Sequence, residues 1–252
     1  MNPAWREYFG REGFLVLRNY FRAAEVAALE EGWLRFRRDI APRLEPGHVM
    51  YEDPHDPETL KQADCVHREP GLDAFRHAGK IRDLAEWLIG PVVPQHAEFF
   101  DKPPRGNKPT PPHQDGYYFC LEPNLACTVW IPLDEVDEEN GALCYVPASH
   151  RLGLLHHGAS GVLGFSQGLT ADPGRYGEAW LCAACPGDVL VHHSLTIHLA
   201  GANRSGHRHR RSLGYVFYSA SAVRDEKTWA RYQDSLRTQR EALGVLAAPP
   251  PG

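Results

Sequence analysis

Hydrophobic and polar positions follow two different patterns along the chain. In the first third, apolar side chains recur every three or four residues, the spacing of helices with one buried face. This spacing predicts helices at 3–10, 23–39, 71–78 and 80–89, with one strand at 13–18. Prolines and acidic residues at 40–59 predict a long loop instead, and such a loop in a compact domain is usually functional, often a lid or substrate-entry wall.

Short β-type runs dominate after residue 90, separated by glycine, proline and asparagine. This is typical of antiparallel sandwiches and barrels. Strands are expected at 92–100, 125–133, 142–147, 188–193 and 212–219, then a helix at 225–243 and a fraying tail at 245–252. The sequence therefore predicts a single, mainly β domain over residues 1–252, an α+β fold with peripheral helices packed outside a β-barrel.

Composition narrows the function. The chain has 252 residues, a net charge of −5 and a pI near 6.3, whereas binding to nucleic acid or a membrane surface needs a basic excess. Residues 1–20 carry five charges and no uninterrupted apolar run, which predicts neither a signal peptide nor a transmembrane helix. Six scattered cysteines fit reduced thiols. We expect a cytoplasmic enzyme acting on a small molecule; its oligomeric state is not predicted.

The segment 111–116 carries the candidate chemistry. His113 and Asp115 are two residues apart, so in an extended strand both side chains would point to one face. A second imidazole would complete a 2-His-1-carboxylate triad, which holds Fe(II) and leaves coordination positions open for substrate and oxygen. His198, in an apolar segment, is the candidate. His193 competes with it, and we interpret His193 as structural or as a neighbour of the site.

Several motifs make the chain resemble the phytanoyl-CoA dioxygenase family of Fe(II)/2-oxoglutarate-dependent oxygenases. In chain order they are Lys102-Pro103-Pro104, His113-Gln114-Asp115, 130–134, Glu139-Asn140-Gly141, 146–150, 187–190, and His198 followed by Asn203 and Arg210. The resemblance implies a double-stranded β-helix, a distorted, cupin-like jelly roll. It also implies that His113, Asp115 and His198 bind Fe(II), with 2-oxoglutarate and O2 as cosubstrates.

The resemblance further implies which residues bind 2-oxoglutarate. Arg210 aligns with the family's partner of the distal carboxylate, and Lys61 and Trp130 fall where the family contacts this cosubstrate. Arg211 competes with Arg210, because the preceding loop is one residue longer than usual. Strand alternation lets one of the two face the pocket, and aligning Ser212-Leu213 with the family strand selects Arg210. A guanidinium suits the role because it offers a carboxylate two parallel charge-assisted hydrogen bonds.

Two classes of function follow. The first is an oxygenase that hydroxylates an unactivated C–H while 2-oxoglutarate is converted to succinate and CO2; desaturation, epoxidation and cyclisation use the same oxidant and stay open. Asp115 disfavours chlorination, since halogenases replace this carboxylate with a small residue. The second is a cupin-like metal-binding protein, an isomerase, hydrolase or non-catalytic protein without oxygenase activity. Arg210 favours the first class, because a basic residue about a dozen positions after the last metal ligand is needed to bind a dicarboxylate cosubstrate.

Three other features have plainer readings. Cys182 and Cys185 have zinc or redox spacing, but without a second pair nearby packing is favoured. The basic run 204–211 could bind nucleic acid; in an acidic chain, a solvated loop ending in a functional arginine is the better interpretation. Aromatic side chains predict a partly aromatic pocket wall without indicating the substrate: Phe99, Phe100, Tyr117, Tyr118 and Phe119.

Overall fold

Two antiparallel sheets make up the core of the fold in the computed structural model, which describes residues 1–45, 47–53, 55–77, 79–104, 108–162 and 164–242. The larger sheet has, in spatial order, β1 (Phe14–Leu17), β12 (Val189–His193), β7 (Ala126–Pro132), β14 (Ser212–Ser219), β4 (Val92–Phe100), β3 (Leu60–Ala63) and β2 (Val49–Tyr51). The smaller sheet has β11 (Trp180–Cys182), β8 (Leu143–Tyr145), β13 (His198–Ala200) and β5 (Thr110–His113). The predicted α+β fold built on a jelly-roll barrel is confirmed.

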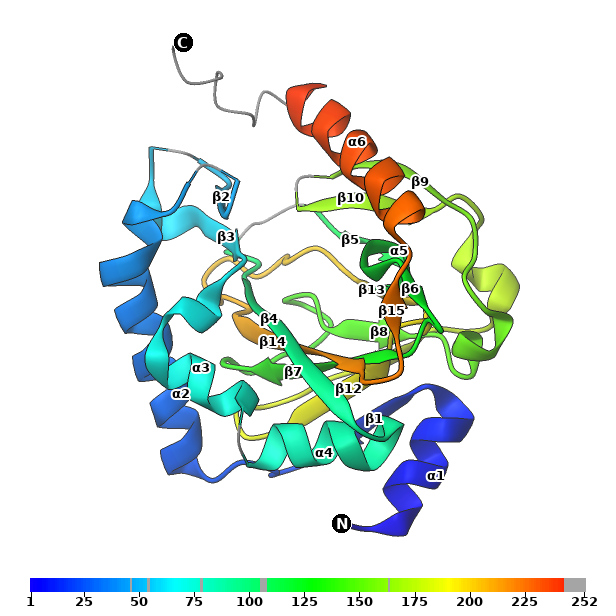
Figure 1. The fold of residues 1–252 in the computed structure, drawn as a ribbon. Helices are drawn as coiled ribbons and strands as arrows, with labels where there is room; N and C mark the ends of the chain where they lie inside the picture. The colour runs from blue at the N-terminus through cyan, green and yellow to red at the C-terminus, as the bar shows by residue number, and fades with distance from the viewer. Residues whose placement is uncertain (46, 54, 78, 105–107, 163, 243–252) are drawn as a thin grey trace.

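Helices cover the outer face of the larger sheet, as Figure 1 shows. They are α2 (Ala23–Arg35), α3 (Pro70–His77) and α4 (Lys80–Ile89), with α1 (Pro3–Glu12) beside β1. Alternate residues of the central strands pack against these helices, among them Val129, Ile131, Val191, Leu213 and Tyr215. The residues between them face the smaller sheet: Thr128, Trp130, Leu190 and His192.

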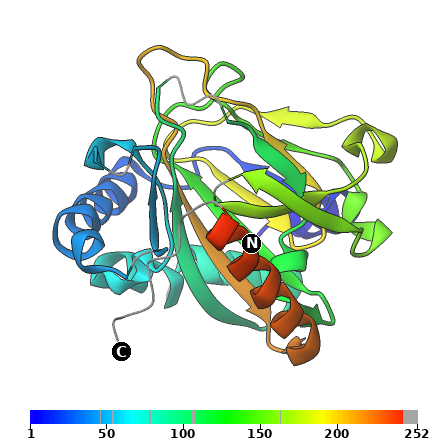
Figure 2. The ribbon, with the colours of Figure 1, turned by 90° about the horizontal axis from the view of Figure 1, so that it is seen from above.

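The C-terminal helix lies across the open end of the barrel. α6 (Glu226–Ala242) follows the short pair β6 (Leu121–Glu122) and β15 (Val223–Arg224), and crosses beside the hairpin β9 (His157–Val162) and β10 (Phe165–Leu169), as Figures 1 and 2 show. A side-chain hydrogen bond connects the helix to this hairpin: Gln167 Nε2 donates to Ser235 Oγ at 2.9 Å. Residues of α6 therefore form one wall of the space inside the barrel.

The predicted elements agree with the structure except in three places. The helix predicted at 23–39 is α2 continued by a π-helical turn, Phe36–Ile40. The loop predicted at 40–59 is wrong in part, because it contains short 3-10 turns and β2, which pairs with β3 at the sheet edge. Six strands of three residues or more were also not predicted: β3, β5, β9, β10, β11 and β13. Residues 78 and 243, at the ends of two predicted helices, and the tail 245–252 lie outside the described residues.

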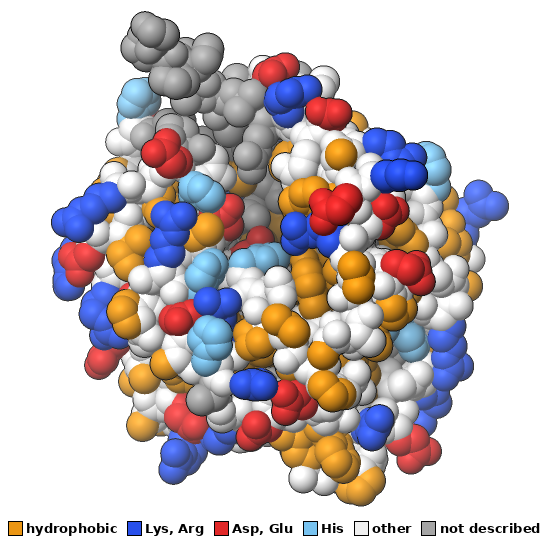
Figure 3. Space-filling model, in the orientation of Figure 1, with side chains coloured by type: hydrophobic (Ala, Val, Ile, Leu, Met, Phe, Trp, Pro, Cys, Tyr) orange, Lys and Arg blue, Asp and Glu red, His pale blue; other side chains and the backbone are white. Residues whose placement is uncertain are grey.

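Charges of both signs are interspersed over the face shown in Figure 3, and a hollow opens between the side of α6 and the side of β2 and β3. Part of the basic run 204–211 is paired with acidic neighbours. Arg208 pairs with Asp137 at 2.8 Å and with Glu139 at 2.6 Å, and His209 pairs with Asp101 at 2.7 Å. Within the described ranges, no helix is long and apolar enough to cross a bilayer.

Candidate metal and cosubstrate site

A cavity of about 400 Å³ lies between the two sheets and beneath α6. All six side chains that the sequence nominated line it, as a metal set (His113, Asp115, His198) and a cosubstrate set (Lys61, Trp130, Arg210). His193 is not among its lining residues; its Nδ1 accepts a hydrogen bond from the backbone of Leu195 at 3.0 Å, and its ring faces Phe9. The competing histidine therefore points away from the site.

His113 and His198 face each other across two neighbouring strands. They are direct register partners of β5 and β13, and their ring centroids lie 4.1 Å apart. Nδ1 of His113 lies 2.8 Å from the Pro111 carbonyl oxygen, and Nδ1 of His198 lies 3.0 Å from that of Thr196. A carbonyl can only accept, so each Nδ1 carries the proton and each Nε2 keeps a lone pair for a metal.

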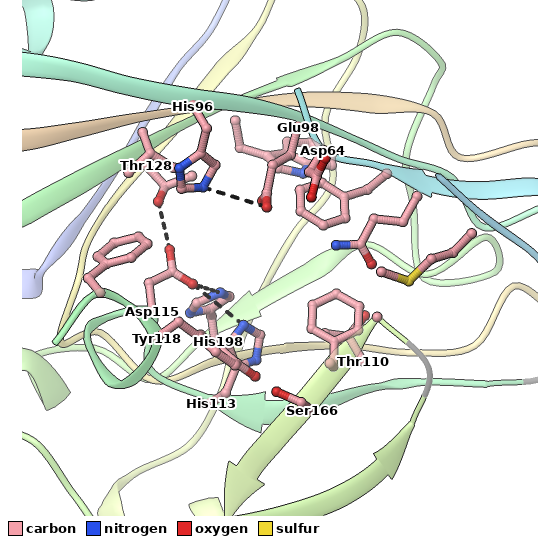
Figure 4. Close-up of a pocket in the computed structure, with 18 of the residues that line it drawn as sticks. Asp64, His96, Glu98, Thr110, His113, Asp115, Tyr118, Thr128, Ser166 and His198 are labelled. Atoms are coloured by element: carbon pink, nitrogen blue, oxygen red, sulfur yellow. Dashed lines mark hydrogen bonds and ion pairs between the residues drawn. The ribbon is translucent and has the colours of Figure 1, made fainter. Parts of the chain in front are cut away.

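Asp115 reaches the same point by a route that the sequence did not predict. β5 ends at His113, and Asp115 has helical backbone angles, φ −55° and ψ −32°, just before the short helix α5 (Gly116–Phe119). Alternation along one strand is therefore the wrong explanation for its direction. Oδ1 lies 3.6 Å from His113 Nε2 and 3.5 Å from His198 Nε2. The three ligand atoms lie within 4.8 Å of one another, so the residues can hold one metal ion (Figure 4).

The second oxygen of Asp115 is held by the larger sheet. Oδ2 accepts hydrogen bonds from Thr128 Oγ1 at 2.6 Å and from His192 Nε2 at 3.0 Å, and Nδ1 of His192 lies 3.0 Å from the Tyr145 hydroxyl. Sequence reasoning missed His192, although the alternation of β12 contained the signal. Leu190 faces inward, so His192, two residues later, faces inward too.

The protonation states of Asp115 and His198 suit a divalent metal. Burial alone would raise the pKa of Asp115, but His198, His113 and His192 hold it well below its usual range. Burial, together with His113 and His192, lowers the pKa of His198 well below its usual value. A carboxylate and a neutral imidazole are the forms that bind metal, so neither of these two side chains must lose a proton first.

Buried cations line another part of the cavity. Arg210 is 4% exposed, and its guanidinium carbon lies 5.7 Å from the centre of the Trp130 ring. It donates to Ser212 Oγ at 3.2 Å, while its Nε has no hydrogen-bond partner among the described residues. Lys102 also lines this region; burial, with the charges of Arg210 and Lys61, lowers the pKa of Lys102 to about 6. Lys102 belongs to the Lys-Pro-Pro motif but was not predicted as a site residue.

The two competing arginines point in opposite directions. Arg211 forms ion pairs with Asp134 at 2.7 Å and Glu30 at 2.9 Å and does not line the cavity, whereas Arg210 does. Both arginines precede β14, which begins at Ser212. Their side chains therefore continue, beyond the end of the strand, the alternation of side-chain directions along it. Lys61 is nearly buried and lies 3.2 Å from Glu52, which partly neutralises it. Arg210 forms no ion pair with any of the described residues, so its charge can pair with a bound anion.

The predicted aromatic wall is correct in part. Phe100, Tyr118 and Phe119 line the cavity. Phe99 does not, because it stacks on Trp33 in the core beneath the helices, and Tyr117 stacks on His157 instead. Cys182 is buried and Cys185 exposed, and both are free thiols.

A jelly-roll barrel with two histidines and one carboxylate converging in its cavity defines the class of non-haem Fe(II)/2-oxoglutarate-dependent dioxygenases. Within this class, the chain belongs to the phytanoyl-CoA dioxygenase (PhyH) family, whose sequence pattern matches residues 9–212. The family resemblance inferred from the motifs is confirmed.

Individual relatives are distant. The chain is 27% identical over 221 residues to the peroxisomal phytanoyl-CoA dioxygenase of Rattus norvegicus, covering 79% of this chain but 63% of the relative. It is 26% identical over 223 residues to a probable alpha-ketoglutarate-dependent hypophosphite dioxygenase of Stutzerimonas stutzeri, covering 84% and 77%. The chain thus spans less than two thirds of the length of the rat enzyme.

Solved structures agree with the fold. EvdO2 from Micromonospora carbonacea var. aurantiaca, complexed with 2-oxoglutarate, superposes with a TM-score of 0.69 at 26% identity, covering 89% of this chain and 93% of that one. EctD from S. alaskensis, with 2-oxoglutarate and 5-hydroxyectoine, superposes with a TM-score of 0.71 at 20% identity, covering 88% and 77%. The second likeness supports the fold alone.

Proposed function

We propose that this protein is an Fe(II)- and 2-oxoglutarate-dependent oxygenase that hydroxylates an unactivated C–H of a small molecule. His113, Asp115 and His198 would hold the iron through two Nε2 atoms and Oδ1. Bound iron would supply the activation of O2 and the conversion of 2-oxoglutarate to succinate and CO2. Hydroxylation is favoured over chlorination because Asp115 fills the position that a halide would need.

One observation carries the proposal: the buried guanidinium of Arg210 has an unpaired Nε in the same cavity as the triad. A buried donor without a partner is costly, because it has lost its water and gained nothing in return. A dicarboxylate cosubstrate would supply the missing acceptor. One of its ends would reach the metal and the other would reach Arg210.

The neighbouring side chains support this role. The Trp130 ring packs against the Arg210 guanidinium and limits its orientation, while Ser212 holds one terminal nitrogen. Lys61 lines the same region, and Lys102, whose pKa burial lowers to about 6, can take up a proton there when an anion binds. A site with the Arg210 guanidinium, a lysine that can take up a proton and a metal position is complementary to a dianion.

A cupin-like metal-binding protein without oxygenase activity needs the triad but not the anion site. Anaerobic addition of Fe(II) and 2-oxoglutarate separates the two functions, because 2-oxoglutarate bound to Fe(II) gives a visible charge-transfer absorbance. We expect that band in the native protein and its loss in His113→Ala, Asp115→Ala and His198→Ala. Succinate release stimulated by one compound of a screen would then identify a substrate. Metal binding without any response to 2-oxoglutarate would favour the second function.

A further inference from the structure

The wall that faces the triad across the cavity is built from one strand and the end of another. His96, Glu98 and Phe100, alternate residues of β4, line the cavity, while Ala97 and Phe99 between them enter the core beneath the helices. Figure 4 shows His96, Glu98 and Asp64 on the side opposite His113 and His198. This wall takes no part in the metal or cosubstrate contacts described above.

Glu98 is a carboxyl group whose one nearby basic side chain, among the described residues, is a histidine. Its side chain keeps 24% of its surface accessible because it faces the cavity. In the described ranges it accepts no hydrogen bond, and its ion-pair partner is His96, 3.6 Å away. Burial, with the charges of Asp115 and Asp64, raises the pKa of Glu98 to about 8. Burial also lowers the pKa of His96, so this imidazole is neutral and supplies no positive charge.

A second acceptor beside it also lacks a partner. Gln62, on β3, is 8% exposed and lines the cavity; its Oε1 is buried and has no hydrogen-bond partner in the part of the chain that the structure describes. Asp64 lines the cavity too, and its Oδ1 contacts His48 Nδ1 at 2.5 Å. The wall therefore presents two carboxyl groups, with an unpaired amide oxygen buried beside them, and no lysine or arginine belongs to it among the residues that the structure describes.

We propose that this wall binds a cationic amine, so that the primary substrate is a small molecule carrying an ammonium group held by Glu98 and Gln62. The inference rests on the proposed oxygenase function, whose substrate it specifies. An ammonium group donates up to three hydrogen bonds, and its positive charge would pair with the Glu98 carboxylate.

The rest of the cavity fits the same class of ligand. Aromatic rings that can pack against a cation or an apolar skeleton line it beside the acidic wall: Tyr118, Phe119, Tyr218 and Trp229. Arg210 and Lys102 belong to the cosubstrate site, so the anionic cosubstrate and a cationic substrate would bind at different ends of the cavity. An alcohol could satisfy Gln62 but not the charge of Glu98, and a carboxylate would be repelled by it.

The test uses three probes that share a phenyl ring and differ in the polar head: 2-phenylethylamine, 2-phenylethanol and phenylacetate. Each is titrated calorimetrically, under nitrogen, into the protein loaded with Fe(II) and 2-oxoglutarate at about pH 8.5, where Glu98 is mostly ionised. We expect the amine to bind roughly 10-fold or more tightly than either other probe, as a charge-assisted hydrogen bond predicts.

The variants locate that preference. Glu98→Gln, which keeps the shape and removes the charge, should weaken amine binding by roughly 10- to 100-fold and leave the alcohol nearly unchanged. Gln62→Met should weaken the amine by a smaller factor. Glu86→Gln, on the exposed side of α4, is the matched control and should change nothing.

Two outcomes overturn the inference. One is an amine preference that survives in Glu98→Gln; the other is the absence of any preference for the amine in the native protein, including the case in which no probe binds. The charge-transfer band of 2-oxoglutarate is recorded in the same samples. If that band is present while the amine preference is missing, the substrate inference fails alone; if the band itself is missing, the proposed function fails.

Discussion

The two carboxylate oxygens of Asp115 have different partners, and His192 donates a hydrogen bond to the oxygen that faces away from His113 and His198. The Nε2 of His192 donates to Oδ2 at 3.0 Å, which leaves Oδ1 toward His113 and His198. His192 is buried at the inner face of β12 and is held from its other side by the Tyr145 hydroxyl. Its contacts fix the direction of the carboxylate, and with it the position of a bound metal.

Removing His192 should weaken metal binding without removing a ligand. We expect His192→Ala to lower the affinity for Fe(II) about 10- to 100-fold, the usual effect of losing a group that orients a metal ligand. Anaerobic titration against a competing chelator measures it. His193→Ala is the control, because His193 points away from the cavity. Equal losses in the two variants would show that the effect comes from the stability of β12, and no loss in either would contradict the orienting role.

Local patterns predicted the fold well where the strands are long. The alternation of β4, β7 and β14 and the helical spacing of α4 are written in consecutive residues, so their bounds follow from the sequence. β5 and β13 are short, and β5 contains Pro111 and Pro112, which carry no strand signal. These strands exist because they pair with each other, a long-range contact that no local pattern contains.

The candidate site shows the same division. His113, Asp115 and His198 were found because they lie in motifs, although Asp115 arrives through a helical turn and not through the strand. Sequence reasoning considered His193 and overlooked the adjacent His192. It overlooked Glu98 because an acidic residue in a strand usually faces solvent. That it faces a cavity depends on β3 and α6 closing over it, which only the tertiary structure shows.

Binding of 2-oxoglutarate should take up protons through Lys102. Its pKa is about 6, so it is mostly neutral above that pH, and a bound carboxylate would raise the pKa. Since the complex then holds more protons than the free protein, affinity for 2-oxoglutarate should fall as the pH rises above about 6. Calorimetry in two buffers with different ionisation enthalpies measures the proton uptake.

Lys102→Met should bind 2-oxoglutarate more weakly near pH 6 and lose most of this pH dependence. Lys108→Met is the matched control: Lys108 is exposed, and its backbone carbonyl, which the substitution keeps, accepts from Lys102 Nζ at 3.0 Å. A native protein whose affinity is flat between pH 6 and 8 would contradict the role of Lys102.

Glu98 should make the ligand-free protein less stable as the pH rises. The unfolded chain releases this proton near the ordinary value of 4.5, whereas the folded chain keeps it to about 8. Between these values the folded state binds more protons, so the free energy of unfolding falls with rising pH. Glu98→Gln should therefore raise stability at pH 8, by on the order of a few kcal/mol, and change it little at pH 4.

Chemical denaturation of the metal-free protein across that range measures the effect, with Glu86→Gln as the control. Other titratable groups interact electrostatically with Glu98 in the folded protein, so their titration also contributes to the pH dependence: His96, Asp64, Cys65, Asp115, Tyr118 and Tyr218. A stability difference between Glu98→Gln and the native protein that is independent of pH would contradict the raised pKa.

The last prediction separates Arg210 from Arg211. Removing one partner of a buried, hydrogen-bonded charge pair costs ~2–5 kcal/mol, much of it the penalty for leaving the other charge unpaired. At about 1.4 kcal/mol per tenfold, Arg210→Ala should raise the dissociation constant of 2-oxoglutarate roughly 30-fold or more. Arg210→Lys should restore part of the affinity, because lysine lacks the bidentate fork. The charge-transfer absorbance, titrated anaerobically, measures the constant.

Arg211→Ala is the matched control, and its expected defect is of a different kind. It loses the ion pairs with Asp134 and Glu30, so it should lower the stability of the protein and leave 2-oxoglutarate affinity nearly unchanged. Fe(II) affinity should stay the same in all three variants, because neither arginine belongs to the triad. A loss of 2-oxoglutarate binding in Arg211→Ala but not in Arg210→Ala would place the cosubstrate on the other side of the strand. If neither variant loses affinity, the cation site does not bind 2-oxoglutarate, and the result favours a metal-binding protein without oxygenase activity.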